Sequence, residues 1–169
     1  EMSASLVGSE MCIRDRNIYN SVMVRAGANG KPEFCPRAAG HPRTAIGWPI
    51  TPESMEWGTR FIWERYGLPI YITENGISCT DSIHLDGMVH DPARIDFIHR
   101  YLLALRRAID SGVDVRGYFH WSLLDNFEWS EGYNERFGLF YLDYATGKCT
   151  PKDSAAWYAK VAETNGKNL

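Results

Sequence analysis

Short apolar runs alternate with helix-forming segments along this chain, and this alternation constrains the fold more than any other feature. The run LPIYIT at 68–73 follows a predicted helix at 52–66, and the run VDVRGYFHW at 113–121 follows a second predicted helix. Strands that alternate with helices in this way form parallel sheets with right-handed crossovers. The sequence therefore predicts an α/β fold, with the strands covered on both faces.

Both predicted helices have recognisable ends. Thr51 is expected to cap the helix that begins at Pro52, and Gly67 is expected to end it. The second helix is expected to open at Asp91-Pro92 and to close at Gly112. Within it, apolar residues recur at spacings of three and four, which predicts one buried face. These residues are Ile95, Ile98, Leu102, Leu105 and Ile109.

Further segments complete the outline. Residues 17–24, rich in Ile, Tyr and Val, are expected to form a strand. Residues 26–50 are punctuated by glycine and proline and are expected to form a long functional loop. Residues 137–143 are expected to form a hairpin arm, and a terminal helix is expected from Thr150-Pro151 to about Glu163.

The chain is too short to close a barrel. Residues 17–169 supply three parallel strands, whereas a (β/α)₈ barrel takes about 250 residues. A small open sheet and a piece of a larger barrel both fit this count. The long polar loops at 74–90 and 122–136 favour the piece, because barrel active sites lie in the loops that follow the strands.

Residues 1–16 are treated separately. They show neither helical nor strand periodicity, and they lack the apolar core of a secretory signal. They resemble a translated cloning or sequencing junction, so we exclude them from the fold prediction.

Composition excludes several kinds of partner. Lys and Arg number 18 against 21 Asp and Glu, and there is no basic run, so a nucleic-acid partner is not expected. No run approaches the roughly 18 apolar residues of a membrane-spanning helix, so no membrane partner is expected. The four cysteines and five histidines show no metal-ligand spacing, which predicts free thiols and no metal.

Glu74 is the first candidate for chemistry. It ends the apolar run, and Asn75-Gly76 then turns the chain sharply. A carboxylate at the mouth of a parallel sheet suits a nucleophile or a general base. Its position alone is equally compatible with a turn carboxylate that accepts local N–H bonds.

An aromatic segment is the second candidate. Ten aromatic residues lie among the 27 residues from 118 to 144, together with Asp125, Asn126, Glu128 and Glu131. Aromatic faces stack on the C–H patches of sugars, and carboxylates accept from sugar hydroxyls, so the segment suits carbohydrate recognition. The alternative is an aromatic core edge whose charges face solvent.

Several motifs, in order along the chain, resemble the carboxyl-terminal third of family 1 glycoside hydrolases, the β-glucosidase family. The likeness covers residues 17–166. The main motifs are YITENG at 71–76, GYFHWSLLDNFEW at 117–129 and RFGLFYLDY at 136–144. The supporting stretches are NIYN at 17–20, GWPITPE at 47–53, YGLPI at 66–70 and TPKDSAAWY at 150–158.

The resemblance implies a fold and a reaction. Residues 17–169 are then an incomplete (β/α)₈ TIM barrel, the sector around strands 6–8, and residues 1–16 stand where strands one to five would precede. The implied enzyme is a retaining β-glucosidase that releases terminal β-D-glucosyl residues through a glycosyl-enzyme intermediate. Glu74 matches its nucleophile, and Tyr19 matches the tyrosine that hydrogen-bonds the nucleophile and keeps it ionised. The acid/base glutamate of the family lies in an Asn-Glu-Pro motif, which does not occur here, so the fragment alone is expected to be inactive.

The resemblance also implies a substrate site. Trp121 matches the tryptophan under the sugar, and Glu128 matches the carboxylate that accepts from its 4- and 6-hydroxyls. Trp129 sits with them, Phe137 matches the ring near the 6-position, and Trp48 matches the platform for the leaving group. Small β-glucosides or cello-oligosaccharides are the expected partners, with no cofactor.

Two other readings stay open. One is a non-catalytic carbohydrate-binding module, and the other is a structural fragment without a sugar site. Glu74 favours the enzyme, because a binding module needs no carboxylate facing the anomeric carbon. Glu135 departs from the family pattern, where a basic residue is frequent. A cytoplasmic location is expected from the free thiols and from family habit.

Overall fold

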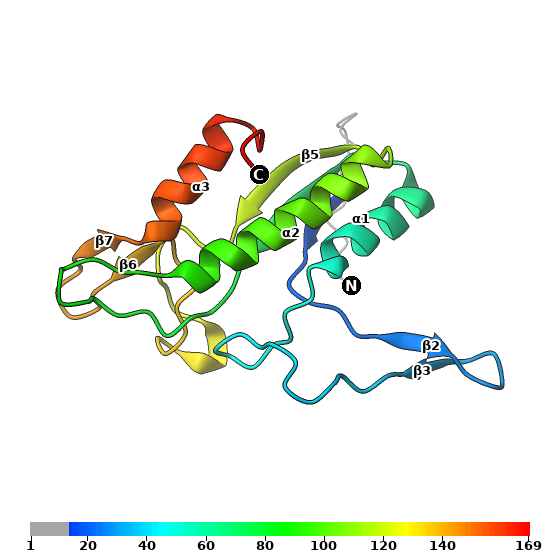
Figure 1. The fold of residues 1–169 in the computed structure, drawn as a ribbon, viewed down its shortest axis with the longest axis horizontal. Helices are drawn as coiled ribbons and strands as arrows, with labels where there is room; N and C mark the ends of the chain where they lie inside the picture. The colour runs from blue at the N-terminus through cyan, green and yellow to red at the C-terminus, as the bar shows by residue number, and fades with distance from the viewer. Residues whose placement is uncertain (1–13) are drawn as a thin grey trace, which may run out of the picture.

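The computed structural model describes residues 14–169, and Figure 1 shows their arrangement. The helices are α1 (Glu53–Tyr66), α2 (Pro92–Asp110), α3 (Asp153–Glu163) and the short 3₁₀ helix η1 (Trp129–Glu131). The strands are β1 (Arg14–Asn17), β2 (Val24–Ala26), β3 (Pro32–Phe34), β4 (Ile70–Asn75), β5 (Val115–His120), β6 (Phe140–Leu142) and β7 (Cys149–Pro151).

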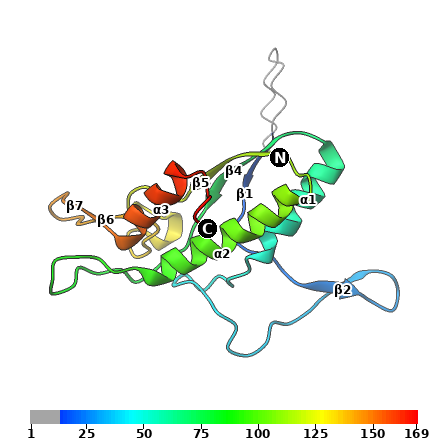
Figure 2. The same ribbon diagram turned by 45° about the horizontal axis from the view of Figure 1, so that its top comes forward.

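The central sheet has the order β1-β4-β5, and both pairings are parallel. This confirms the three parallel strands that the sequence predicts. All three α-helices lie on the same side of the sheet (Figures 1 and 2). The prediction that the strands are covered on both faces is therefore wrong for the described residues, since the sheet has helices on one face only.

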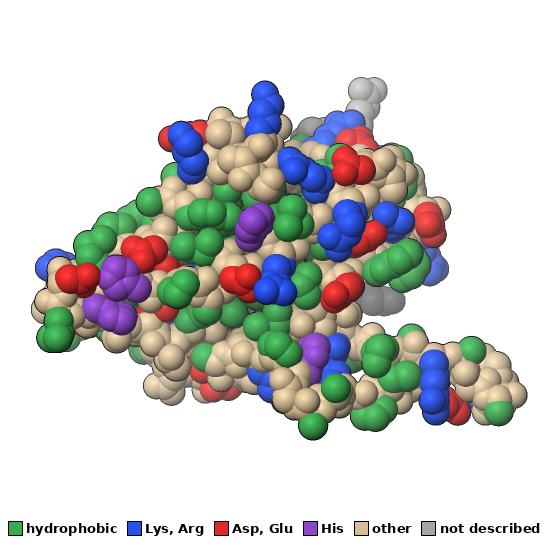
Figure 3. Space-filling model, viewed as in Figure 1, with side chains coloured by type: hydrophobic (Ala, Val, Ile, Leu, Met, Phe, Trp, Pro, Cys, Tyr) green, Lys and Arg blue, Asp and Glu red, His purple; other side chains and the backbone are tan. Residues whose placement is uncertain are grey.

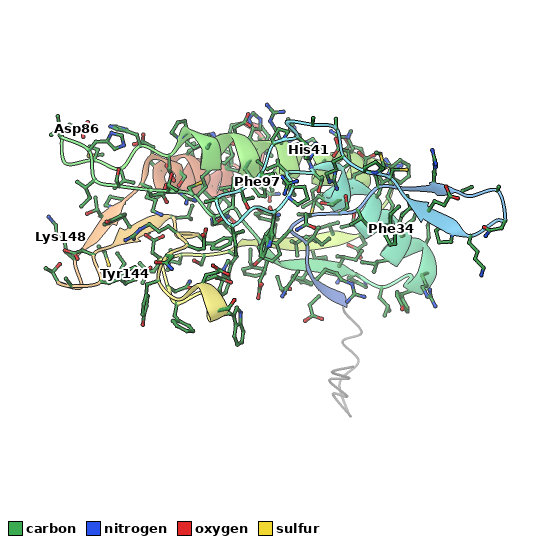
Figure 4. The ribbon with its side chains drawn as sticks, turned by 90° about the horizontal axis from the view of Figure 1, so that it is seen from below. Phe34, His41, Asp86, Phe97, Tyr144 and Lys148 are labelled. Atoms are coloured by element: carbon green, nitrogen blue, oxygen red, sulfur yellow. The ribbon has the colours of Figure 1, made fainter. Side chains whose placement is uncertain are left out.

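The core lies between this sheet and α2. Ile70 and Ile72 of β4 are fully buried and belong to one apolar cluster with Phe97 and Tyr101 of α2, whose rings stack at 4.0 Å. Figure 4 shows Phe97 near the middle of the molecule. The predicted buried face of α2 is confirmed at Ile98, Leu102 and Leu105, whereas Ile95 is half-buried and Ile109 is exposed.

Strand β4 extends two residues beyond its predicted end. The predicted strand stops at Thr73, but β4 continues through Glu74 to Asn75. The main-chain oxygen of Asn75 accepts a 2.8 Å hydrogen bond from Trp121 N, which ties the end of β4 to the end of β5. Glu74 is thus part of the sheet, which fixes its backbone more firmly than a turn would.

The strand predicted at 17–24 is misplaced. β1 covers Arg14–Asn17, so it includes three residues of the excluded segment, and the chain then leaves the central sheet, since β2 pairs with β3 in a separate sheet. Beyond β1, Ile18 N still donates to the Glu74 carbonyl of β4 at 2.9 Å, but side chains bind the next main-chain carbonyls. Asn75 donates to the Ile18 carbonyl at 2.7 Å, and Tyr101 donates to the Tyr19 carbonyl at 2.8 Å. The junction prediction for residues 1–13 lies outside the described residues.

The predicted helix caps differ from the observed ones. Pro52 occupies the N-cap position of α1, and the Thr51 hydroxyl instead accepts from Ser21 N at 2.9 Å. Asp91 is the N-cap of α2, but its carboxylate makes no capping bond. In both cases the side chain binds a residue from another part of the chain, Ser21 for Thr51 and Ser154 for Asp91. Gly67 ends α1 in the left-handed region at φ 61°, as predicted.

The long loop predicted at 26–50 contains part of a hairpin. β2 and β3 pair antiparallel around Asn29-Gly30, where Gly30 has φ 74°. This hairpin projects from the body, with Phe34 at the opposite end of the molecule from Tyr144 (Figures 1 and 4). An Asn-Gly pair between short strands is the signal that could have predicted it.

The carboxyl-terminal segment combines a hairpin with a helix. β6 falls within the arm predicted at 137–143 and pairs antiparallel with β7. Thr150 and Pro151 belong to β7, so the terminal helix begins at Asp153, later than predicted. Among residues 14–169, no helix is long and apolar enough to cross a membrane.

Candidate active site

Glu74 and Tyr19 form the centre of the candidate site. The Tyr19 hydroxyl donates to Glu74 Oε2 at 2.8 Å, and both side chains are half-buried. Burial raises the pKa of Tyr19 above its ordinary value, and the hydrogen bond to Glu74 and its charge raise it further. Tyr19 is therefore a protonated donor at neutral pH, aimed at one carboxylate oxygen.

Two more rings surround Tyr19. The ring of Trp48 lies 5.2 Å from that of Tyr19 and 6.1 Å from that of Phe137, between centroids. Trp48 comes from the loop before α1, where Trp48 N donates to the Thr44 hydroxyl at 3.1 Å. Phe137 is 2% exposed, so the three rings form a firm aromatic wall beside Glu74.

Trp121 and Glu128 form the second part of the site. Trp121 follows β5 directly, and its indole Nε1–H donates to Glu128 Oε2 at 3.4 Å. Burial raises the pKa of Glu128, its bond from Trp121 lowers it, and the charges of Glu74 and Glu135 raise it. Glu128 therefore lies within the electrostatic reach of Glu74, so the structure brings both predicted carboxylates into one neighbourhood.

A glycine permits the close approach of the two segments. A Cβ atom on Gly76 would lie 1.8 Å from the main-chain oxygen of Trp121, which no side chain can tolerate. Gly76 therefore does more than turn the chain after Glu74. It also lets the ends of β4 and β5 come into contact.

Trp129 lies apart from this group. It begins η1, is 83% exposed and has φ 44°. The structure brings together Tyr19, Trp48, Glu74, Trp121, Glu128 and Phe137, but no described contact links Trp129 to them.

His120, buried next to Trp121, does not serve as an acid. Burial, together with the positive charge of Arg94, lowers its pKa to about 3. Its Nε2 lies 3.3 Å from the Phe137 carbonyl oxygen. The ring is therefore neutral and structural. No group of three His, Cys, Asp or Glu side chains suited to a metal occurs among residues 14–169.

Sequence reasoning missed a set of buried charges near these loops. The partners of each ion pair lie between 3 and 71 residues apart in the sequence, so no regular spacing predicts the pairs. Only Asp125 was singled out as a candidate for chemistry, as one of four polar residues among the aromatic rings, and Asp91 was named only as the start of a helix. The members are Asp81, Asp91, Arg94, Asp125, Arg136 and Lys152.

Comparison with known proteins decides the family. The sequence profile of Glycosyl hydrolase family 1 matches residues 10–167. The chain belongs to this family. As a family 1 member it is 45% identical over 153 residues to Beta-glucosidase A of Thermotoga maritima, an alignment that covers 89% of this chain and 34% of that protein. It is also 46% identical over 125 residues to a 6-phospho-beta-galactosidase of Leptotrichia buccalis, covering 73% and 27% of the two chains.

A solved structure confirms the fold of this family 1 chain. The Thermotoga maritima beta-glucosidase in complex with glucoimidazole superposes with a TM-score of 0.82 and 43% identity over 91% of this chain and 35% of that one. The chain therefore spans about a third of the length of these relatives. The predicted α/β sector of a (β/α)₈ barrel is confirmed. Glu74 and Trp121 lie at the carboxyl ends of neighbouring strands, the end at which barrel enzymes carry their active sites.

Proposed function

We propose that this chain supplies the nucleophile and the sugar-binding wall of a retaining β-glucosidase. The observation that carries the proposal is the Tyr19–Glu74 hydrogen bond at the carboxyl end of β4. A nucleophilic carboxylate must be ionised and must point at a fixed place. A protonated phenol that donates to one oxygen favours the ionised form and leaves the other oxygen free to react.

The proposed reaction has two steps. A Glu74 oxygen attacks the anomeric carbon and forms a glycosyl ester, while the glycosidic oxygen leaves with a proton from an acid/base group. Water then attacks the same carbon, gives its proton to that acid/base group and releases Glu74. Two inversions retain the β configuration. Glu74 and Tyr19 belong to this chain, and the acid/base glutamate belongs to the rest of the barrel.

The other site residues are assigned to the sugar. Trp121 provides a flat face for stacking, and its hydrogen bond holds Glu128, which accepts from the 4- and 6-hydroxyls. Phe137 closes the side near the 6-position, and Trp48 provides the platform for the leaving group. Trp129, which is exposed at the start of η1, is assigned to the edge of the sugar site.

Unphosphorylated glucosides are the proposed substrates. Similarity alone does not choose between them and phosphorylated sugars, because one relative is named a 6-phospho-beta-galactosidase. The charges of Glu74 and Glu135 both act on Glu128 in this chain. Glu128, the carboxylate assigned to the 4- and 6-hydroxyls, would repel a dianionic 6-phosphate, and these two further negative charges add to the repulsion.

The proposal is tested in a chimera. Residues 14–167 replace the matching third of Thermotoga maritima Beta-glucosidase A, and the product is assayed with 4-nitrophenyl β-D-glucoside. We expect turnover, with the β anomer of glucose formed first by NMR, and a loss of several orders of magnitude in Glu74→Gln. Glu64→Gln, an exposed change on α1, is the matched control. Sugar binding with no turnover in the folded chimera would favour a carbohydrate-binding module instead.

A further inference from the structure

Six charged side chains form one continuous series of ion pairs near the ends of β4 and β5. Positive and negative charges alternate along this series, and every side chain except that of Arg136 is at most 3% exposed. We call it the ion chain. Its members, in order, are Arg136, Asp125, Lys152, Asp81, Arg94 and Asp91.

Asp125 has more partners than any sequence pattern suggests. Its Oδ1 accepts from Gly138 N at 2.9 Å and from Lys152 Nζ at 2.8 Å. Its Oδ2 accepts from Arg136 at 2.6 Å and from Leu142 N at 3.3 Å. Two main-chain donors and two cations therefore fix this carboxylate in one orientation.

These bonds tie together two segments of the candidate site. Asp125 lies three residues before Glu128, and Gly138 directly follows Phe137. A Cβ atom on Gly138 would lie 2.2 Å from Asp125 N, so the two backbones are in direct contact. The orientation of the Glu128 loop is thus set against the segment that carries Phe137.

The ion chain continues to the loop after β4. Lys152 donates to Asp81 at 2.6 Å, and Arg94 donates to the same Asp81 oxygen at 2.6 Å. Asp81 lies seven residues after Glu74. The loops that follow the two site glutamates are therefore joined through buried charges.

Such a series is better suited to fixing geometry than to adding stability. Burying a charge costs much of what its ion pair returns, whereas removal of one partner leaves an unpaired charge in the interior. The loops at this end have few apolar contacts of their own, since Leu123, Leu124 and Phe127 are all exposed. The hydrogen bonds and ion pairs of Asp125 therefore hold the Glu128 segment in place, a role that apolar packing plays elsewhere in the molecule.

We propose that Asp125 is a positioning residue that holds Glu128 at the 4- and 6-hydroxyls of the sugar. The inference rests on the proposed function and deepens it. Asp125 does not touch the substrate. It acts through the Glu128 loop, so its loss should weaken recognition of the hydroxyls that Glu128 binds more than recognition of the rest of the glycoside.

The test compares two substrates in the chimera. The ratio of kcat/KM for 4-nitrophenyl β-D-glucoside to that for its 6-deoxy analogue reports recognition of the 6-hydroxyl. We expect Asp125→Asn to lower this ratio about tenfold, the size of a hydrogen bond to a charged group. Asp96→Asn, an equal change at a carboxylate of α2 whose side chain is 61% exposed, should leave the ratio unchanged.

A double variant separates positioning from general damage. Asp125→Asn combined with Glu128→Gln should have the same ratio as Glu128→Gln alone, because both changes remove the same interaction, the contact of Glu128 with the 6-hydroxyl. An equal loss on both substrates by Asp125→Asn would overturn the inference. If that variant fails to fold, Arg136→Lys, which keeps the charge at the partly exposed end of the ion chain, must lower the ratio, and an unchanged ratio would overturn the inference equally.

Failure of the inference differs from failure of the proposed function. If Glu128→Gln itself leaves the ratio unchanged, the assignment of Glu128 to the sugar hydroxyls is wrong. If Glu128→Gln lowers the ratio and Asp125→Asn does not, the assignment stands and only the positioning role is wrong.

Discussion

The Tyr19 hydroxyl and Glu74 Oε2 lie 2.8 Å apart although 55 residues separate them in the sequence. Tyr19 follows β1 and Glu74 lies in β4, so the parallel pairing of these strands brings the two side chains together. The backbone agrees with this placement, since Ile18 N donates to the Glu74 carbonyl at 2.9 Å. The Tyr101 hydroxyl of α2 also holds the Tyr19 carbonyl at 2.8 Å, so both the sheet and α2 position the contact.

Glu128 is expected to bind substrate and not to be the acid/base partner of Glu74. In the chimera, Glu128→Ala should raise KM and lower kcat/KM, because hydroxyl contacts are lost. Azide should not restore turnover, since azide replaces a missing acid/base group and not a missing hydroxyl acceptor. Recovery of activity with azide would contradict the assignment.

Phosphorylated sugars are expected to be poor substrates. The chimera should have a higher kcat/KM for 4-nitrophenyl β-D-glucoside than for its 6-phosphate. Glu135→Gln should narrow this difference, because it removes one of the two charges that raise the pKa of Glu128. Glu163→Gln on α3, whose side chain is 69% exposed, is the control. A preference for the 6-phosphate in the unaltered chimera would refute the prediction.

His90 is expected to make stability depend on pH. Its Nε2 and Nδ1 lie 2.9 Å from Asp86 and 2.7 Å from Asp153, and the ring of His84 lies 5.1 Å away. In Figure 3, histidine and acidic side chains gather at this end of the molecule, which Figure 4 marks with Asp86. The hydrogen bonds to Asp86 and Asp153 raise the pKa of His90 from 6.5 to about 9.

The sign of the His90 effect follows from this shift. The folded protein holds the proton more tightly than the unfolded chain, so the contribution is complete below pH 6.5 and is lost as pH rises through about 9. His90→Gln should therefore lower the Tm of the chimera more at pH 6 than at pH 10. Leu85→Gln, a change at an exposed residue of the same loop that carries no titratable group, is the control. Equal Tm differences for His90→Gln at both pH values would contradict the prediction.

The 169-residue chain alone is expected to be neither a stable domain nor an active enzyme. Within the described residues, β1 and β5 each have one unpaired edge, and Phe119 on β5 is 57% exposed. Trp57 and Phe61 on α1 are 49% and 61% exposed. Open edges and apolar surface favour self-association over folding.

Expression of the chain alone checks both halves of that prediction. Gel filtration and thermal unfolding should show aggregates without a cooperative transition, and an aryl β-glucoside assay should show no turnover. The missing acid/base group alone costs about 10²–10⁴-fold. A folded, inactive monomer would contradict only the first half, whereas a folded monomer with turnover would contradict both.

The sequence predicted the elements that local chemistry dictates. The Gly67 end, the α2 periodicity and the apolar run of β4 are local signals, and each appears in the structure. Side-chain bonds from distant elements determine the rest. The backbone after β1 bonds to Asn75 and Tyr101, and the Thr51 hydroxyl bonds to Ser21, so local patterns misplaced both the strand and the cap.

The candidate site was predictable only in part. Motif resemblance indicated Tyr19, Glu74 and Glu128, and the structure places all three in one neighbourhood. The ion chain could not be predicted, because each charge resembles an ordinary surface residue until the fold buries it. Asp81 and Lys152, for example, are 71 residues apart and nearly inaccessible to solvent.

The most direct test of the account is covalent labelling of Glu74. A 2-deoxy-2-fluoro β-glucoside with an activated leaving group should form a long-lived ester in the chimera. The fluorine slows both formation and hydrolysis of the ester, whereas the activated leaving group speeds its formation only. Peptide mass spectrometry should find the label on Glu74 within YITENG, and none in the Glu74→Gln variant. A label on Glu128, or on any other residue, would contradict the assignment of Glu74 as the nucleophile.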